Sequence, residues 1–451
     1  MQAAPSKGAA PNRAPVLTVA QVAGMDPASR AAYLATLNPS DQQAMQAQLL
    51  DYKRRANFRY MVESIDKVTR CIPTSGGTNA AYSAGQTLIF DIPTASGAFA
   101  KELIFTLNLT ATFAAGTGAT YALNAAGILA AIDNIRVEFN GAQAQLRPYI
   151  LKYLYQLRGY LRAAPGSVVA SQTVATIQTA LGTTTPGVAT GANTWNLVFR
   201  LPLNALHDLR PEGMLPAMGQ GTKPQVKITC APNPLGADPV LNCAVVTAGT
   251  GGALTISGTV AVDVIYRDGT YLGGLDKLPL DLSGLGTAQY ITDQTLNPLS
   301  ANLLMRQRLT ALMQHYYVIG VVVDAQQSAK FATVGNIAAL EMDEDSVGQN
   351  KLQAWGLSAG GNISINDFYE RFRRHFGQDL DEGVIVWVAA PGFGQYDASN
   401  GEGRQVLDMT PGKWTDVNLG YQVNAVGAVA GVTARVEHYL VSLNPQGLVF
   451  G

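Results

Sequence analysis

The chain has 451 residues, of which 47% are hydrophobic and only 14% are charged. This length is typical of two to three domains, and the hydrophobic share excludes global disorder. Lys and Arg total 31 and Asp and Glu total 32, a net charge of −1. Near neutrality excludes a globally basic nucleic-acid binder, because neutralising phosphates requires excess positive charge. The 46 glycines and 22 prolines indicate many short strands joined by turns.

The cysteines Cys71, Cys230 and Cys243 form no CxxC pair. We expect free thiols in a chain that matures in a reducing compartment. The N-terminal residues lack the apolar core of a secretory signal. Two uncharged stretches, 103–132 and 163–199, are interrupted by Gly, Asn and Thr, so neither is expected to span a bilayer.

Helical signals follow an Ala- and Pro-rich segment, residues 1–24, that we expect to be mobile. Asp26-Pro27 and Asn38-Pro39 each place an N-cap residue before a proline, which predicts two helix starts. The second helix is predicted from Pro39 to about Val62. Its apolar residues share one face and form a packing stripe: Met45, Leu49, Tyr52, Ala56 and Tyr60.

A basic cluster accompanies this stripe: Lys53, Arg54, Arg55 and Arg59. A basic amphipathic helix can lie on an anionic membrane surface, where each Lys or Arg contributes roughly 1 kcal/mol. The alternative is a helix that packs its stripe on a β-sandwich and leaves its charges in water.

From Ile72 onward, apolar residues recur at every second position, which is typical of half-buried antiparallel strands. The first block of such strands includes Leu103–Phe113, Ile135–Phe139, Trp195–Leu203 and Leu254–Tyr266. The second block includes Tyr316–Val323, Val384–Val388, Val417–Val423 and Arg435–Leu443.

Each block also contains one short helical pattern, near Leu146–Leu161 and near Asn366–Phe376. A Gly-rich segment separates the blocks, which share an order of elements but no strong sequence repeat. We therefore predict an all-β protein with two consecutive eight-stranded jelly-roll β-sandwiches and an N-terminal helical arm. The predicted divisions are a mobile segment and amphipathic arm over 1–70, a first jelly roll over 71–268, a linker over 269–280 and a second jelly roll over 281–451.

No catalytic, cofactor or metal site is predicted, because the four histidines are scattered and no phosphate loop or nucleophile elbow is present. The acidic run Glu341–Asp345 is predicted to be a solvated loop, with a weak cation site as the alternative. The basic run Glu370–His375 is predicted to be a solvated helix face. Its alternative is a contact with Asp379, Asp381 and Glu382 of an adjacent chain.

The order of elements resembles the double jelly-roll major capsid proteins of tailless, internal-membrane bacteriophages, the tectiviruses and their relatives. The pieces that carry the resemblance are the arm Pro39–Arg59, the strand Trp195–Leu203 with Asp208–Gly213 and Val226–Thr229 after it, the strand Thr255–Tyr266 with Leu275–Pro279 after it, and an Arg-rich helix before Gly383–Val388. The resemblance covers residues 26–451. The uncharged insert Ala163–Thr194 and the first 25 residues depart from it.

The resemblance implies a homotrimeric, pseudo-hexagonal capsomer that tiles an icosahedral shell over an internal membrane enclosing double-stranded DNA. The implied partners are other copies of the chain within the trimer, neighbouring trimers, vertex or penton and minor capsid proteins, and the lipid surface, without sequence-specific nucleic-acid binding. The implied location is the virion capsid, assembled in the bacterial host cytoplasm. Lys53, Arg54, Arg55 and Arg59 would then face the membrane or neighbouring trimers.

Two alternatives remain open from the sequence. One is a receptor- or carbohydrate-binding sandwich of the spike type, for which exposed Trp355 and Trp414 would be the binding aromatics. The other is a jelly-roll enzyme, which would need histidine or carboxylate ligands converging at a barrel mouth.

Overall fold

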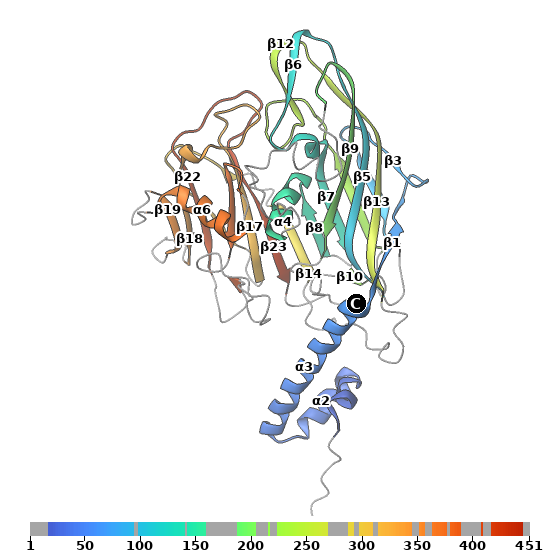
Figure 1. Cartoon of the computed structure of the whole chain (residues 1–451). Coiled ribbons are helices and arrows are strands. Elements are labelled where there is room, and N and C mark those ends of the chain that lie inside the picture. The colour runs from blue at the N-terminus through green and yellow to red at the C-terminus, as the bar shows by residue number, and fades with distance from the viewer. Residues whose placement is uncertain are drawn as a thin grey trace, which may run out of the picture.

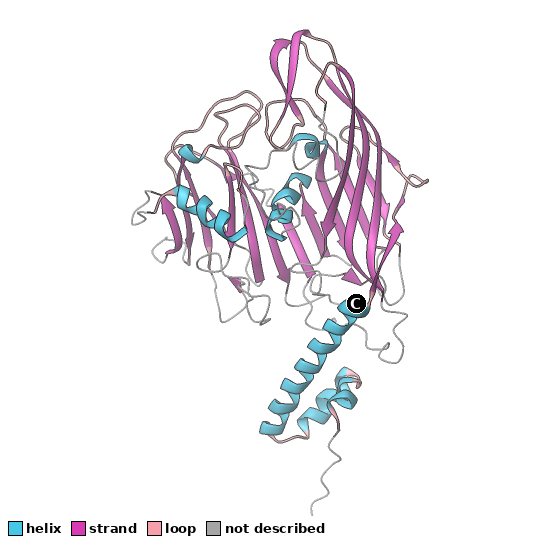
Figure 2. Ribbon diagram, in the orientation of Figure 1, coloured by secondary structure: helices cyan, strands magenta, loops and turns pink. Residues whose placement is uncertain are grey.

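The computed structural model describes residues 17–93, 98–139, 142–158, 187–203, 215–216, 223–268, 287–292, 297–309, 314–344, 351–356, 363–376, 379–388, 407–408 and 416–444. In this part of the chain, two β-sandwiches stand side by side and a group of helices projects below them (Figure 1). Figure 2 shows that strands dominate both sandwiches and that helices dominate the projection.

The first sandwich pairs two antiparallel sheets. One contains β1 (Ile65–Arg70), β13 (Leu254–Asp268), β5 (Ala98–Phe113) and β9 (Gly191–Pro202) in that order, with β3 (Ala80–Ala81) beside β13 and β10 (Leu215–Pro216) beside β5. The other has the order β2 (Ile72–Pro73), β4 (Thr87–Asp91), β11 (Gln225–Cys230), β7 (Ile132–Phe139) and β8 (Ala142–Leu146).

The second sandwich has the same design. One sheet contains β14 (Thr287–Thr292), β23 (Arg435–Asn444), β17 (Gln314–Val323) and β20 (Val384–Val388), with β15 (Asn297–Pro298) beside β23 and β21 (Leu407–Asp408) beside β17. The facing sheet has the order β16 (Met305–Arg308), β22 (Asn418–Val423), β18 (Ile337–Asp343) and β19 (Lys351–Gly356).

The strand orders identify both sandwiches as jelly rolls. The main strands in chain order are β1, β4, β5, β7, β8, β9, β11 and β13 in the first, and β14, β16, β17, β18, β19, β20, β22 and β23 in the second. In both, one sheet places the first, eighth, third and sixth strands side by side, and the other places the second, seventh, fourth and fifth. This is the two-sheet jelly-roll arrangement, so the predicted fold is confirmed.

The short helices occupy equivalent places in the two barrels. The 3₁₀ turn η2 (Pro148–Ile150) and α4 (Leu151–Arg158) connect the fifth and sixth strands of the first barrel, and α6 (Ile365–Phe376) does so in the second. The helical segment of the first barrel was predicted to start near Leu146. It starts at Pro148, because Leu146 is the last residue of β8. The strand β1 also lies within residues assigned to the arm, so the first barrel begins six residues earlier than predicted.

Side chains that alternate along the strands fill a core that continues through both barrels. In the first barrel, Phe105 and Phe199 stack with ring centroids 4.9 Å apart. In the second, the indole nitrogen of Trp387 donates a 2.7 Å hydrogen bond to the Tyr421 hydroxyl. Phe368 of α6 packs edge-on against Trp387, with ring centroids 6.2 Å apart.

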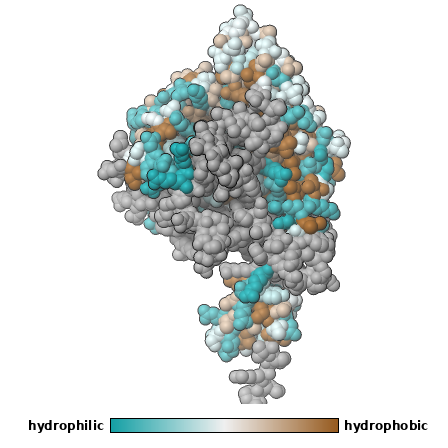
Figure 3. All heavy atoms as spheres, viewed as in Figure 1, coloured by the Kyte–Doolittle hydropathy of each residue, from teal (hydrophilic) through white to brown (hydrophobic). Residues whose placement is uncertain are grey.

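The first barrel extends into a tower at the end opposite the helices (Figure 1). The tower contains β6 (Thr117–Leu123) paired with β12 (Ala244–Thr250), next to the upper ends of β5 and β13. The turn η1 (Gly127–Ala131) lies at its base, and η3 (Val334–Asn336) occupies the corresponding connection of the second barrel. Figure 3 shows the tower in pale colours, because Thr, Gly and Ala dominate it.

The projecting helices form a foot made of α1 (Val19–Ala23), α2 (Pro27–Ala35) and α3 (Pro39–Glu63). The starts of α2 and α3 match the predictions. The short α1 lies in a segment expected to be mobile; a reciprocal cap between Thr18 and Gln21 holds its first turn. No helix in the described ranges is long and apolar enough to cross a membrane.

The three thiols give a test of this fold, because all of them are buried. Burial raises the pKa of the Cys71 thiol to about 12 from 9.0. We expect no reaction with a thiol reagent at pH 8 in the folded protein, and three reactive thiols after denaturation. Reaction of any thiol under native conditions would contradict the described packing.

The raised pKa of Cys71 also predicts how the stability of the fold depends on pH. The folded pKa of Cys71 lies above its unfolded value, so its stabilising contribution is present below pH 9 and is lost as the pH rises toward 12. Denaturation measured across this range should show a smaller alkaline loss in Cys71→Ala than in the parent chain.

Candidate functional site: the junction between the barrels and the helical foot

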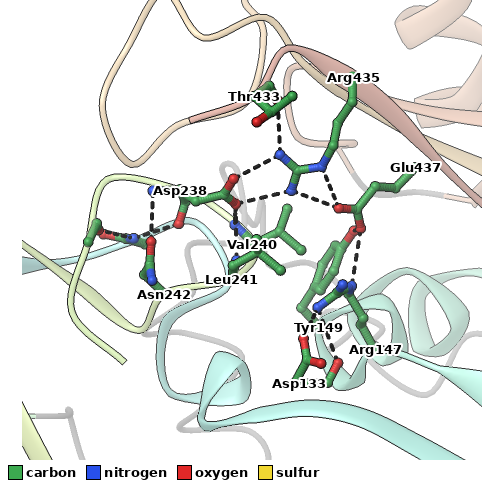
Figure 4. Close-up of polar contacts among 12 residues, drawn as sticks. Asp133, Arg147, Tyr149, Asp238, Val240, Leu241, Asn242, Thr433, Arg435 and Glu437 are labelled. Carbon is green, nitrogen blue, oxygen red and sulfur yellow. Dashed lines mark hydrogen bonds and ion pairs between the residues drawn. The ribbon is translucent and has the colours of Figure 1, made fainter. Parts of the chain in front are cut away.

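A buried guanidinium joins the two barrels. Arg435, on β23 of the second barrel, donates to both carboxylate oxygens of Asp238 in the first barrel, at 2.8 and 3.1 Å (Figure 4). The two side chains are only 2% and 3% exposed. A bidentate pair of this kind fixes the relative orientation of the two side chains as well as the distance between them.

Glu437 extends this junction on the same strand. Its carboxylate accepts from Arg435 Nε at 2.7 Å and from the Tyr439 hydroxyl at 2.8 Å. From the first barrel, Tyr149 donates at 3.3 Å and Arg147 Nε lies 3.4 Å away. Arg147 also pairs with Asp133, so the network ends on β7 (Figure 4).

Local geometry holds Asp238 in place. Its Oδ1 accepts from the backbone N–H groups of Val240 and Leu241, at 2.9 and 3.0 Å. Burial opposes the charge on Arg435, but Glu437 and Asp238 more than offset burial and raise its pKa. The guanidinium therefore remains charged, and removing either barrel's partner would leave an uncompensated buried charge.

A second polar contact lies between α4 and the turn before β20. Lys152 Nζ pairs with Asp381, and the Tyr153 hydroxyl donates to the same carboxylate at 2.8 Å. Burial lowers the pKa of Lys152, and Asp381 opposes this effect. The Ala329 backbone in the second barrel also exchanges hydrogen bonds with Ala125 and Ala237 of the first. The barrels thus form one body.

The foot uses part of the predicted stripe for its own packing. Leu49 is buried, and Met45 and Tyr52 are half-buried, where α1 and α2 pack against α3. Arg30 of α2 donates to the last carbonyls of α1, including Ala23 at 3.0 Å. The side chains of Ala56 and Tyr60 lie outside the described part of the structure.

The predicted basic residues lie in the later half of α3, between the part of the helix that α1 and α2 cover and the start of β1. Arg55 is exposed and pairs with Asp51 one turn earlier. The side chains of Lys53, Arg54 and Arg59 lie outside the described part. We call residues 53–59 the basic section of α3.

The first part of the acidic run is not the solvated loop that the sequence predicted, although Glu344 is exposed and Asp345 lies outside the described residues. Glu341 and Asp343 belong to β18 and are fully buried, where Arg306 of β16 lies 3.1 Å from Asp343. The ordered strand pairing of β18 with β22 places these carboxylates inside the structure. In the described ranges, no group of three or more His, Cys, Asp or Glu side chains could hold a metal ion.

The arginines of α6 pair within their own chain, and Arg373 and Arg374 are exposed, as predicted for a solvated helix face; the alternative was a contact with an adjacent chain. Arg371 pairs with Asp367, Arg374 with Glu370, and Arg373 with Asp379. Asp381 is engaged by Lys152. The α6 surface is therefore electrostatically satisfied without a second molecule.

The tryptophan proposed for glycan binding is also used internally. Trp355 is buried and packs edge-on against Phe368, with ring centroids 5.2 Å apart. Trp414 lies outside the described residues. Trp355 is thus part of the core, which removes one of the two aromatics on which the binding alternative depended.

Sequence reasoning missed the junction. Asp238 and Arg435 are 197 residues apart, and no local pattern links them. A weak signal was present in β23, where the charged residues Arg435 and Glu437 stand at the start of a strand whose remaining residues include Val436, Tyr439, Leu440, Val441 and Leu443. Charges within a buried strand indicate internal partners, but they do not identify Asp238.

Solved structures that resemble this chain support the fold that the strand order indicates. No family model and no curated protein matches the sequence. A crystal structure of the STIV MCP superposes with a TM-score of 0.53 at 12% identity, covering 84% of this chain and 96% of that one. A chain from the atomic structure of Sulfolobus Turreted Icosahedral Virus gives 0.52 at 11% identity, covering 84% and 90%.

The chain is thus a double jelly-roll protein, by its strand order and by these structural neighbours. Its two barrels are joined by a buried ion network, and a helical foot and an uncharged tower lie at opposite ends.

Replacing Arg435 tests the junction. Arg435→Met leaves Asp238 buried without its cation and Glu437 with Arg147 alone, so we expect a loss of about 3–5 kcal/mol in the free energy of unfolding. The matched control is Arg308→Met, which removes the exposed pair with Asp416 and should cost less than about 1 kcal/mol. Equal effects in denaturant titrations would contradict a buried, charged junction.

Proposed function

We propose that this protein is a major capsid protein whose trimers form pseudo-hexagonal capsomers of an icosahedral virion. The single observation that carries the proposal is the repetition of one topology in two barrels that form one body. Three such chains present six similar barrels, which is the outline needed to tile a near-hexagonal lattice. The role is structural and requires no cofactor or catalytic residue.

The structural neighbours support this proposal. The first is an MCP, the abbreviation for major capsid protein, and the second belongs to an icosahedral virus. On this basis we place the protein in the virion capsid. Assembly in the cytoplasm of a bacterial host is proposed from the resemblance to the bacteriophage capsid proteins alone. Vertex or penton and minor capsid proteins would be its further partners.

The tower and the foot lie at opposite ends of the molecule and differ in composition, so they distinguish its two ends in the proposed shell. We propose that the tower points outward and that the foot points toward an internal membrane that encloses double-stranded DNA. The foot stands clear of the barrels on α3, whose 25 residues span about 37 Å. Its basic section would meet anionic headgroups or neighbouring trimers.

This membrane contact would be mainly electrostatic. The apolar stripe of α3 is already partly covered by α1 and α2, with Leu49 buried, which leaves less apolar surface for insertion between lipids. Arg55, by contrast, is exposed. Attraction between surface charges is screened by salt, which separates this mode from hydrophobic insertion.

The solution mass of the full-length protein tests the capsomer. We expect light scattering to give a mass near three times 47.6 kDa. A monomer at all accessible concentrations would overturn the trimeric capsomer.

Sedimentation with lipid vesicles tests the basic section. Replacing Lys53, Arg54, Arg55 and Arg59 by Gln removes about 4 kcal/mol of attraction at low salt, so binding to anionic vesicles should fall roughly a thousandfold. The matched control replaces four exposed basic residues of the barrels by Gln: Lys223, Arg308, Arg373 and Arg374. Equal losses in both variants would assign the binding to general charge; no binding by the parent chain would assign the basic section to neighbouring trimers.

A further inference from the structure

The strand β1 joins the helical foot to the first barrel with almost no connecting loop. The helix α3 ends at Glu63 and β1 begins at Ile65, so Ser64 is the one residue between them. Figure 1 shows the foot below the barrels, with α3 leading up to β1. A movement of the foot is therefore transmitted along a stiff helix to this strand.

The side chains of β1 contribute little to the hydrophobic core. Five of its six residues are exposed, and the sixth, Thr69, is half-buried. Its two large aliphatic residues, Ile65 and Val68, are 53% and 58% exposed. Elements with few buried apolar contacts open locally at a lower free energy than core strands do. Apolar packing thus does little to hold β1 in its sheet.

The neighbouring strand β13, by contrast, is central to the barrel. It lies between β1 and β5, and its residues Val260, Val262 and Val264 are fully buried. In the described part of the chain, β1 pairs with β13 alone, with Ile65–Arg70 opposite Asp263–Asp268. Departure of β1 would therefore leave the pairing of β13 with β5 intact.

Three ion pairs fasten the two ends of β1. At its lower end, Asp66 lies 3.0 Å from Arg267 of β13 and 3.4 Å from Lys101 of β5. At its upper end, Arg70 lies 2.5 Å from Asp263 of β13. The register places Asp66 directly opposite Arg267, and Arg70 directly opposite Asp263. Opposite charges at such cross-strand positions stabilise the pairing of two strands.

Water reaches these ion pairs from the side of β1. The side chains of Asp66 and Arg70 are 42% and 43% exposed, whereas their three partners on β13 and β5 are less than half as exposed. Dissolved ions screen exposed pairs, because the screening length falls from about 10 Å at 0.1 M salt to about 3 Å at 1 M. Buried pairs, such as those at the junction of the barrels, are screened much less. Salt therefore weakens the attachment of β1 selectively.

We propose that β1 is a salt-labile clasp, which separates from β13 as a unit while the rest of the first barrel stays folded. The opening ends at Cys71, whose side chain is fully buried and whose N–H donates to the Val262 carbonyl at 2.9 Å. It frees residues 64–70, which span at most about 24 Å when extended. The ionic strength around the protein thereby sets how far the foot can move from the barrels.

Hydrogen exchange of the full-length protein tests the clasp. In about 1 M NaCl the amides of β1 should exchange about tenfold faster than in about 0.05 M NaCl, because three exposed ion pairs are screened. The amides of β5, on the far side of β13, should keep their protection, and the buried Cys71 thiol should stay unreactive. A β1 that is as protected as β5, or that exchanges equally in both salts, would overturn the inference.

A single substitution separates the clasp from general stability. Asp66→Asn removes two of the three ion pairs and preserves the shape of the side chain. It should raise the exchange of β1 about fivefold at low salt and leave the high-salt rate at the parent value. The control is Asp416→Asn, at a partly exposed carboxylate that pairs with Arg308 in the second barrel. Equal acceleration of β1 by both variants would contradict a local clasp.

A disulfide tests whether the opening separates β1 from β13. Val68 and Ile265 lie opposite each other in the register of the two strands, so Val68→Cys with Ile265→Cys can join them. The oxidised variant should lose the salt-dependent exchange of β1, and reduction of the same variant should restore it. Salt-dependent exchange that persists after oxidation would overturn the clasp. The capsomer proposal would survive that result, because the clasp is a property of the single chain.

Discussion

The arrangement of this molecule depends on one buried guanidinium. Arg435 is surrounded by Asp238 and Glu437, and all three side chains are withdrawn from water at the boundary between the barrels. A buried charge tolerates little displacement from its partners, because the loss of a partner leaves the free-energy cost of removing that charge from water uncompensated. The network therefore holds two domains that could otherwise move at an orientation set by hydrogen-bond geometry.

Rigid coupling of the barrels matters for the proposed assembly. A lattice of pseudo-hexagonal units requires the two barrels of each chain to keep a constant angle, since an error at every junction accumulates around a ring.

The distribution of charge along the long axis of the molecule agrees with the proposed assembly of copies of the chain. The tower and the outer face of the first barrel are uncharged over their upper part. In the foot, Asp26, Arg30 and Asp41 lie at the N-cap of α2, in α2 and at the start of α3, while the basic section of α3 adjoins the barrels. Surfaces that meet copies of themselves benefit from low net charge, because like charges repel.

Local patterns in the sequence determined much of the structure. Proline after an N-cap residue set the starts of α2 and α3, and alternation of apolar residues identified the long strands, including β5, β9 and β13. These signals act over one turn of helix or a few strand residues, so a single stretch of sequence contains them. The double jelly roll itself followed from the order of these elements and a family resemblance.

Tertiary structure alone decided the rest. It placed Glu341 and Asp343 in a buried strand instead of a loop, used Trp355 in the core, and gave the α6 arginines partners within the chain. It also joined Asp238 to Arg435 across 197 residues. Such pairings depend on which strands become neighbours after folding, and no local propensity specifies that choice. The sequence by itself determined the elements and their faces, whereas the packed structure determined which charges would be buried together.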